Sequence, residues 1–126
     1  MPTLDHLIMK VNDIEASVRF YTGILGFSCE GTQGPFTIIR VGPDCQLQLA
    51  PWGTPGMEHY AFAVSPDEFT AIFERIKAAG VAHGPSFHAV GTNTGPGEET
   101  GARGRGPTLY FNDPNQHLLE IRTHAV

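Results

Sequence analysis

The chain has 126 residues, a length that suits one compact domain or two small modules sharing a core. Apolar residues make up 40% and charged residues 17%, and the formal net charge of −5 offers no basic stripe for phosphate backbones, so we expect no nucleic-acid partner. No apolar run approaches the ~20 residues of a membrane helix, and residues 1–5 lack the basic start and apolar core of a signal peptide. We therefore expect a cytoplasmic protein with no membrane partner.

The first half of the chain predicts a strand, a helix and three further strands. The helix covers residues 12–25, with Asn12 and Glu15 as a capping box at its start and Gly26 to end it. Short runs of strand character follow at residues 27–30, 36–41 and 46–50. This half is therefore a βαβββ module, residues 1–50.

The second half repeats the same order after a linker, residues 51–56, that is rich in turn formers. Ser65, Pro66 and Glu68 supply an N-cap, a proline in the first turn and a capping box, and Gly80 ends the helix. Strands are predicted at residues 86–90, 108–112 and 117–122, with an irregular glycine-rich stretch at 90–106. The second βαβββ module is then residues 57–126.

Two such modules predict an α+β protein formed by duplication. Each meander packs one face on its helix and leaves the other face free, so two paired copies would form one concave mixed sheet with the helices on its outer face. We therefore expect a single domain over residues 1–126 with a cavity shared by both modules.

Each module carries a histidine at the same place near its start, His6 and His59, 53 positions apart. Side chains alternate between the two faces of a strand, so both histidines point away from the helices if their apolar neighbours face the core. The same alternation sends Glu120 to that face. Two imidazoles and one carboxylate from three strands form a ligand set for one divalent metal ion, and we predict such a site.

Two further residues are candidates for the site. Gln48 takes the place in the first module that Glu120 takes in the second, so it is a possible fourth oxygen ligand, with a hydrogen-bonded structural role as the alternative. Tyr110 is a candidate for orienting a substrate oxygen or donating a proton, with strand packing as the alternative. Without a metal, an ion pair with Arg40 or Arg122 would have to neutralise Glu120.

Together, the motifs resemble the vicinal oxygen chelate superfamily, which includes glyoxalases, fosfomycin-modifying thiol transferases, extradiol dioxygenases, epimerases and metal-free bleomycin-binding proteins. The resemblance rests on residues 4–7, 20–27, 58–62 and 110–121 and covers nearly the whole chain. It implies a glyoxalase-like fold, usually a homodimer whose sites can draw ligands from both chains, and a metal held by His6, His59 and Glu120.

Departures from the subfamily patterns leave several reactions open. Glyoxalases with two glutamate ligands need an acid where this chain has Gln48, and Ile8 replaces the hydroxyl residue of the fosfomycin transferases. We expect a homodimeric enzyme that uses a divalent ion (Fe, Mn, Co, Ni or Zn) on a small substrate with adjacent oxygens, as a lyase, isomerase or dioxygenase, with Glu120 and Tyr110 in its chemistry. The alternative is a metal-free protein that sequesters a small molecule, as bleomycin-resistance proteins do.

Overall fold

The computed structural model describes residues 1–124 of the chain. These residues belong to two compact units, Met1–Pro55 and Gly56–Val126. The boundary falls within the segment 51–56 that was predicted as the linker, and each unit is described by itself below.

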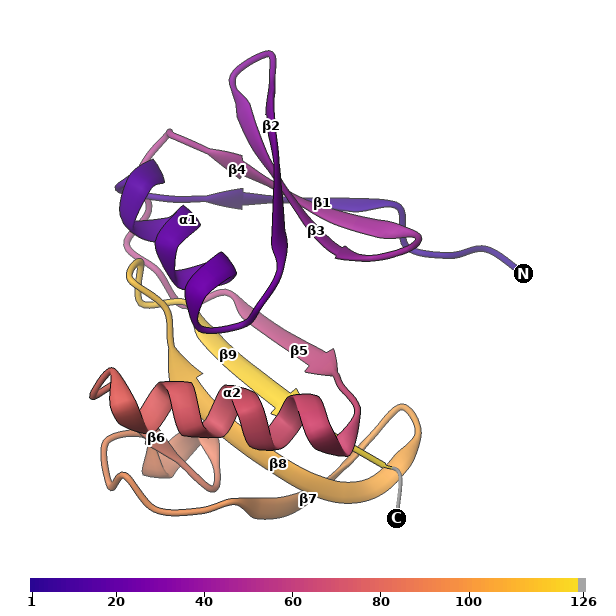
Figure 1. The fold of residues 1–126 in the computed structure, drawn as a ribbon, viewed down its shortest axis with the longest axis vertical. Helices are drawn as coiled ribbons and strands as arrows, with labels where there is room; N and C mark the ends of the chain where they lie inside the picture. Colours follow the sequence, from indigo (N-terminus) through magenta and orange to yellow (C-terminus); the bar gives the residue numbers. More distant parts are fainter. Residues whose placement is uncertain (125–126) are drawn as a thin grey trace. The chain divides into compact units, whose positions relative to one another are not determined.

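The first unit contains one helix and a four-stranded sheet (Figure 1). The strand order is β1-β4-β3-β2, in which β1 runs parallel to β4 and the remaining pairs are antiparallel. In chain order the elements are β1 (His6–Lys10), α1 (Ile14–Gly23), β2 (Ser28–Gln33), β3 (Phe36–Gly42) and β4 (Cys45–Ala50). This is the βαβββ order that the sequence predicts.

The start of α1 differs from the prediction. Asp13, not Asn12, is the N-cap, and its side chain accepts a hydrogen bond from the backbone N–H of Ala16 at 3.1 Å. Asn12 instead accepts a hydrogen bond from the backbone N–H of Thr54 at 2.8 Å. Both residue types can cap a helix, and Asn12 is drawn away by a partner 42 positions along the chain that a local pattern cannot reveal.

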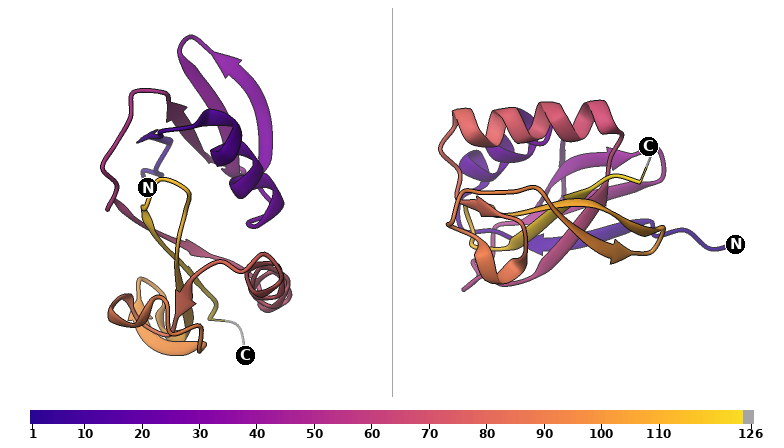
Figure 2. Two further views of the ribbon diagram at one scale, coloured as in Figure 1. Left: turned by 90° about the vertical axis from the view of Figure 1, so that its left-hand side faces the viewer. Right: turned by 90° about the horizontal axis from the view of Figure 1, so that it is seen from below.

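The second unit contains one long helix and a five-stranded sheet (Figure 2). The strand order is β5-β9-β8-β6, with β7 pairing with β8 and with β5 parallel to β9. The elements are β5 (His59–Ala63), α2 (Pro66–Ala78), β6 (His83–Gly84), the 3₁₀ turn η1 (Phe87–Ala89), β7 (Gly97–Gly101), β8 (Gly104–Asn112) and β9 (Leu118–Arg122).

The capping signals of α2 are confirmed. Ser65 accepts a hydrogen bond from the backbone N–H of Glu68, and the Glu68 side chain accepts one from the backbone N–H of Ser65, which completes the capping box. Gly80, with φ at +68°, follows the last turn in the left-handed conformation that favours glycine. Phe69, Ile72 and Ile76 are the buried residues of the helix.

Two predictions for the second unit are wrong. Residues 86–90 form no strand, because η1 and a turn in which Gly91 and Asn93 both donate to the carbonyl of His83 occupy this segment. The segment 90–106, predicted to be irregular, contains β7, which forms a hairpin with β8. Its glycines and charges carry no apolar alternation, so the pairing partner alone makes it a strand.

The α+β class and the two βαβββ-like modules are confirmed, and backbone hydrogen bonds make two mixed sheets, one in each unit. The core positions follow strand alternation. Met9 and Val11 are fully buried in the first unit, as are Leu119 and Ile121 in the second. Within residues 1–124, neither helix has the length and apolar character that crossing a bilayer requires.

Candidate functional site

In the first unit, His6 lies on the face of β1 opposite the buried Met9, as alternation predicts. Its Nδ1 lies 2.7 Å from Oδ2 of Asp5. A carboxylate can only accept, so Nδ1 is the donor of this contact and Nε2 is the ring nitrogen that could bind a metal. A histidine held through one nitrogen by a carboxylate is the usual arrangement for a metal ligand.

Gln48 lies on the same face of this sheet. Gln48 pairs with Ile8 on β1, while His6 pairs with Gln46. Gln48 therefore lies two residues along β4 from the residue that pairs with His6. The side-chain amide of Gln48 donates to Oε1 of Gln46 at 3.2 Å. This bond orients the amide through its nitrogen and leaves its oxygen as the atom that could act as a ligand.

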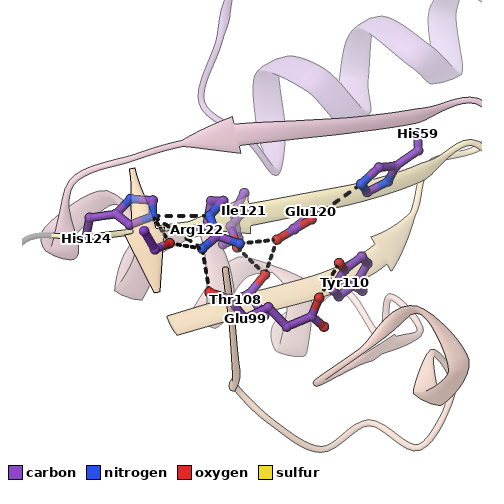
Figure 3. Close-up of polar contacts among 9 residues, drawn as sticks. His59, Glu99, Thr108, Tyr110, Glu120, Ile121, Arg122 and His124 are labelled. Carbon is purple, nitrogen blue, oxygen red and sulfur yellow. Dashed lines mark hydrogen bonds and ion pairs between the residues drawn. The ribbon is translucent and has the colours of Figure 1, made fainter. Parts of the chain in front are cut away.

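The second unit repeats this geometry with His59 and Glu120. His59 pairs with Leu118, and Glu120 pairs with Ala61, two residues beyond His59. The Nδ1 atom of His59 is 3.0 Å from the carbonyl oxygen of Leu118, so this nitrogen must be the donor. Its other ring nitrogen, Nε2, lies 3.4 Å from Oε1 of Glu120 (Figure 3).

Glu120 is a buried carboxylate, with 5% of its side chain exposed. Its Oε2 accepts hydrogen bonds from Oγ1 of Thr108 at 2.5 Å and from Nη1 of Arg122 at 2.8 Å (Figure 3). Burial by itself would raise the pKa of Glu120, but hydrogen bonds from Thr108 and Arg122 outweigh it and hold the pKa below its usual range. Glu120 is therefore ionised at neutral pH, with Oε2 occupied and Oε1 facing His59.

Arg122 is fixed on its other side by the β7–β8 hairpin. Its Nη2 donates to the backbone carbonyls of Glu99 at 2.7 Å and Gly104 at 3.2 Å, and its Nε lies 3.4 Å from Nε2 of His124. A guanidinium whose donors are used in several directions has little freedom to rotate. Arg122 thus holds Glu120 in one orientation.

Tyr110 lies directly across the strand ladder from Glu120. Its ring stacks on His59, with centroids 5.8 Å apart and planes inclined by 15°, and its hydroxyl donates to Oε1 of Glu99 at 2.9 Å. Burial, together with hydrogen bonding to Glu99 and Glu120, raises the pKa of Tyr110 well above its ordinary value. The phenol keeps its proton at neutral pH.

The donor atoms of the second unit fit a metal ion. Nε2 of His59 and Oε1 of Glu120 face each other across 3.4 Å, a contact that a shared proton or a shared cation stabilises. Two ligands bound to one ion at ~2.1 Å lie about 3.0–3.4 Å apart at octahedral or tetrahedral angles, so the observed separation suits a shared ion. Within residues 1–124 no group of three or more His, Cys, Asp or Glu side chains forms a metal site.

The structure thus brings together three of the five predicted site residues, His59, Tyr110 and Glu120, in the second unit, and it places His6 and Gln48 on one face of the first. Of the residues around Glu120, sequence reasoning missed Thr108 and Glu99. Arg122 follows Glu120 by two residues on the same strand, so the two side chains share a face, and this spacing could have indicated their ion pair. Of the two arginines named from the sequence, Arg122 is the partner of Glu120. Arg40 pairs with Glu30 instead, at 3.1 Å.

Comparisons with known proteins agree with this architecture. The family model of the Glyoxalase/Bleomycin resistance protein/Dioxygenase superfamily matches residues 3–121. The solved structure of "Oxidase ChaP-H1" is 32% identical with a TM-score of 0.82, over 99% of this chain and 98% of its own. "Virulence protein STM3117" of Salmonella typhimurium is 28% identical over 131 residues, covering 97% of this chain and 84% of its own length. "Glutathione transferase FosA" of Serratia marcescens is 25% identical over 133 residues, covering 100% and 84%. Proteins named as enzymes are thus among the relatives.

Proposed function

Because the chain belongs to the glyoxalase/bleomycin resistance protein/dioxygenase superfamily, we propose that it is a metal-dependent enzyme acting on a small substrate with two adjacent oxygens. One observation carries the proposal: Nε2 of His59 and Oε1 of Glu120 lie 3.4 Å apart, a separation that suits two ligands of one ion, while the other side of each group is already hydrogen-bonded. Groups oriented in this way are prepared to share a cation.

We propose His6, His59 and Glu120 as ligands of one divalent ion, with Gln48 as a fourth candidate. His6 has the same arrangement as His59, with Nδ1 bonded to an oxygen and Nε2 available. When bound, the ion would act as a Lewis acid that takes both substrate oxygens and stabilises negative charge on them. We also propose that the protein works as a homodimer, which sedimentation of the purified chain would test.

The chain's own residues would position the reaction. Thr108 and Arg122 occupy Oε2 of Glu120, so that only Oε1 is available and the carboxylate would bind through one oxygen. Tyr110, stacked on His59, carries a protonated hydroxyl that can donate to a substrate oxygen. Among the reactions open to such a site, we favour oxygen-dependent oxidation of the substrate, since "Oxidase ChaP-H1" is 32% identical over nearly the whole chain.

A metal-free binding protein is the second candidate, and one contact favours it. Arg122 lies 2.8 Å from Glu120 and supplies the countercharge that a buried carboxylate needs in the absence of a metal. This contact occupies Oε2 alone, however, and leaves Oε1 at 3.4 Å from Nε2 of His59, a separation that suits two ligands of one ion. The metal-dependent enzyme is therefore the better account of the carboxylate.

Metal content separates the two candidates. Protein purified without chelator, or titrated with Zn²⁺, should bind one ion per chain, and His59→Ala should remove it. His88→Ala is the matched control, because His88 is an exposed histidine of η1 and its loss should leave metal binding unchanged. A wild-type protein that binds no ion would refute the proposal.

The reaction class needs a separate assay. Protein loaded anaerobically with Fe²⁺ should consume oxygen when a catechol is added, and Glu120→Gln should abolish this consumption. Loss of glutathione with an electrophilic substrate, in the absence of oxygen uptake, would instead assign the chain to thiol transfer, as in the relative named a glutathione transferase.

A further inference from the structure

The β7–β8 hairpin brings a second carboxylate next to the site. Glu99 on β7 is partly buried, and its Oε1 accepts the hydrogen bond of the Tyr110 hydroxyl at 2.9 Å. Its backbone carbonyl accepts from Nη2 of Arg122 at 2.7 Å, so both its main chain and its side chain are held (Figure 3). Its neighbour Glu98 lies on the other side of the strand and pairs with Arg105 at 3.1 Å. Only Glu99 is directed to the site.

Tyr110 connects this carboxylate to the proposed ligands. The ring stacks on His59, and the residue lies across the ladder from Glu120. The hydroxyl has one proton, and its hydrogen bond of 2.9 Å directs that proton to Oε1 of Glu99. Tyr110 can therefore move a proton only by giving one to Glu99 while it accepts another.

We infer that Glu99 accepts, through the Tyr110 hydroxyl, the proton that a hydroxyl-bearing substrate loses as it binds beside His59 and Glu120. This inference rests on the proposed function and narrows its substrate class to molecules with a dissociable hydroxyl next to a second oxygen, such as catechols. A catechol must lose protons before both oxygens can bind a cation strongly, and a nearby base makes that loss easier.

The proton balance of this step is simple. The substrate O–H bond breaks as a new O–H bond forms on Tyr110, while the original Tyr110 O–H bond breaks as Oε1 of Glu99 is protonated. The substrate is left as an oxyanion, Tyr110 is unchanged and Glu99 becomes neutral. Partly buried Glu99 can then return its proton to solvent, so no further reactant is needed.

The groups that surround Glu99 are compatible with this role. The charged and titratable groups that contact it are Tyr110, through its hydroxyl, and Arg122, whose guanidinium bonds the backbone carbonyl and not the carboxylate. His124 contacts Arg122 on the far side. The Glu99 carboxylate therefore has no ion-pair partner among residues 1–124 that would prevent it from taking a proton.

The test uses 4-nitrocatechol, whose protonated and ionised forms absorb at different visible wavelengths. The probe is bound to Zn²⁺-loaded protein, since this ion is colourless and redox-inert, and its spectrum is followed from pH 5.5 to 8. In the wild type the bound probe should ionise at a lower pH than in the variant without the Glu99 carboxylate, because that carboxylate accepts its proton. In Glu99→Gln the midpoint of ionisation should rise by about one pH unit or more, a tenfold change in the proton equilibrium.

Two variants complete the experiment. Tyr110→Phe should shift the midpoint in the same direction, because the connecting hydroxyl is lost, while Glu98→Gln removes the same charge from the same strand and should match the wild type. Unchanged midpoints in both Glu99→Gln and Tyr110→Phe, with the probe bound, would overturn the inference and leave the proposed function standing. Failure of the wild type to bind the probe would overturn both.

Discussion

Replacement of Arg122 by methionine tests whether the buried ion pair, and not packing alone, holds Glu120 in place. The change keeps a long apolar side chain and removes the guanidinium that lies 2.8 Å from Glu120, where both side chains are less than a tenth exposed. Breaking a buried pair by removing one partner costs about 3–5 kcal/mol, because the remaining charge is left without compensation. At about 4 °C per kcal/mol for a chain of this size, the melting temperature should fall by ~12–20 °C.

The assays are thermal unfolding, for the melting temperature, and urea unfolding, for the free energy, of metal-free protein, both followed by circular dichroism. Arg40→Met is the matched control, because Arg40 makes an ion pair of similar length with Glu30 at the surface, where water screens both charges. The control should lose far less stability than Arg122→Met. A second variant, Arg122→Met with Glu120→Leu, should recover much of the loss, since an apolar pair leaves no buried charge.

The pH dependence separates charge from packing. In the wild type the pKa of Glu120 is lowered, so its contribution to stability is present above the ordinary carboxyl pKa of about 4.3 and is lost as pH falls through the lower, folded-state value. Without Arg122, burial would raise this pKa, and the variant would lose stability as pH rises through it. The stability difference should be largest near pH 7 and shrink below about pH 4–5. A difference that does not change with pH would refute the reasoning.

Two further predictions test other parts of the chain. Asp5→Asn should weaken Zn²⁺ binding about tenfold, because Asp5 orients the ring of His6 through a hydrogen bond to Nδ1. Asp44→Asn, in the exposed β3–β4 turn, is the control and should leave Zn²⁺ binding unchanged. Competition with a coloured chelator measures both affinities, and equal affinities in the two variants would remove His6 from the ligand set. Ser65→Ala should lower the free energy of unfolding by about 1 kcal/mol, because the α2 cap is lost. Ser86→Ala is the control and should change it little, because Ser86 stands at an N-cap position with no side-chain cap bond. Urea unfolding measures both, and similar losses in the two variants would contradict the role of the capping box.

Local rules in the sequence were enough for several elements. The capping box of Ser65 and Glu68 and the left-handed Gly80 mark the ends of α2, because these signals act over three or four residues. Strand alternation placed His59 and Glu120 on the same face, since the period of two is a property of the extended backbone itself. The equivalence of Gln48 and Glu120 also followed from the repeat.

Local rules failed where a segment is shaped by distant partners. Residues 86–90 have strand character in the sequence, yet they contain the 3₁₀ turn η1, in which the backbone N–H of Ala89 donates to the carbonyl of Ser86. Strand β7 has no apolar alternation, and its pairing with β8 makes it a strand. The hairpin matters for the site because it carries Glu99.

The sequence by itself determined which residues could lie on the open face of each sheet, because that depends only on parity along a strand. It left Arg40 and Arg122 as equal partners for Glu120 and gave no reason to place Thr108 or Glu99 against Arg122. Only the tertiary structure decided these contacts, because the register of β8 against β9 places Thr108 opposite Arg122 and the hairpin supplies the Glu99 carbonyl that fixes the guanidinium. A hydrogen bond needs atoms within about 3 Å, and positions that accurate are set by the packing of strands far apart in the sequence.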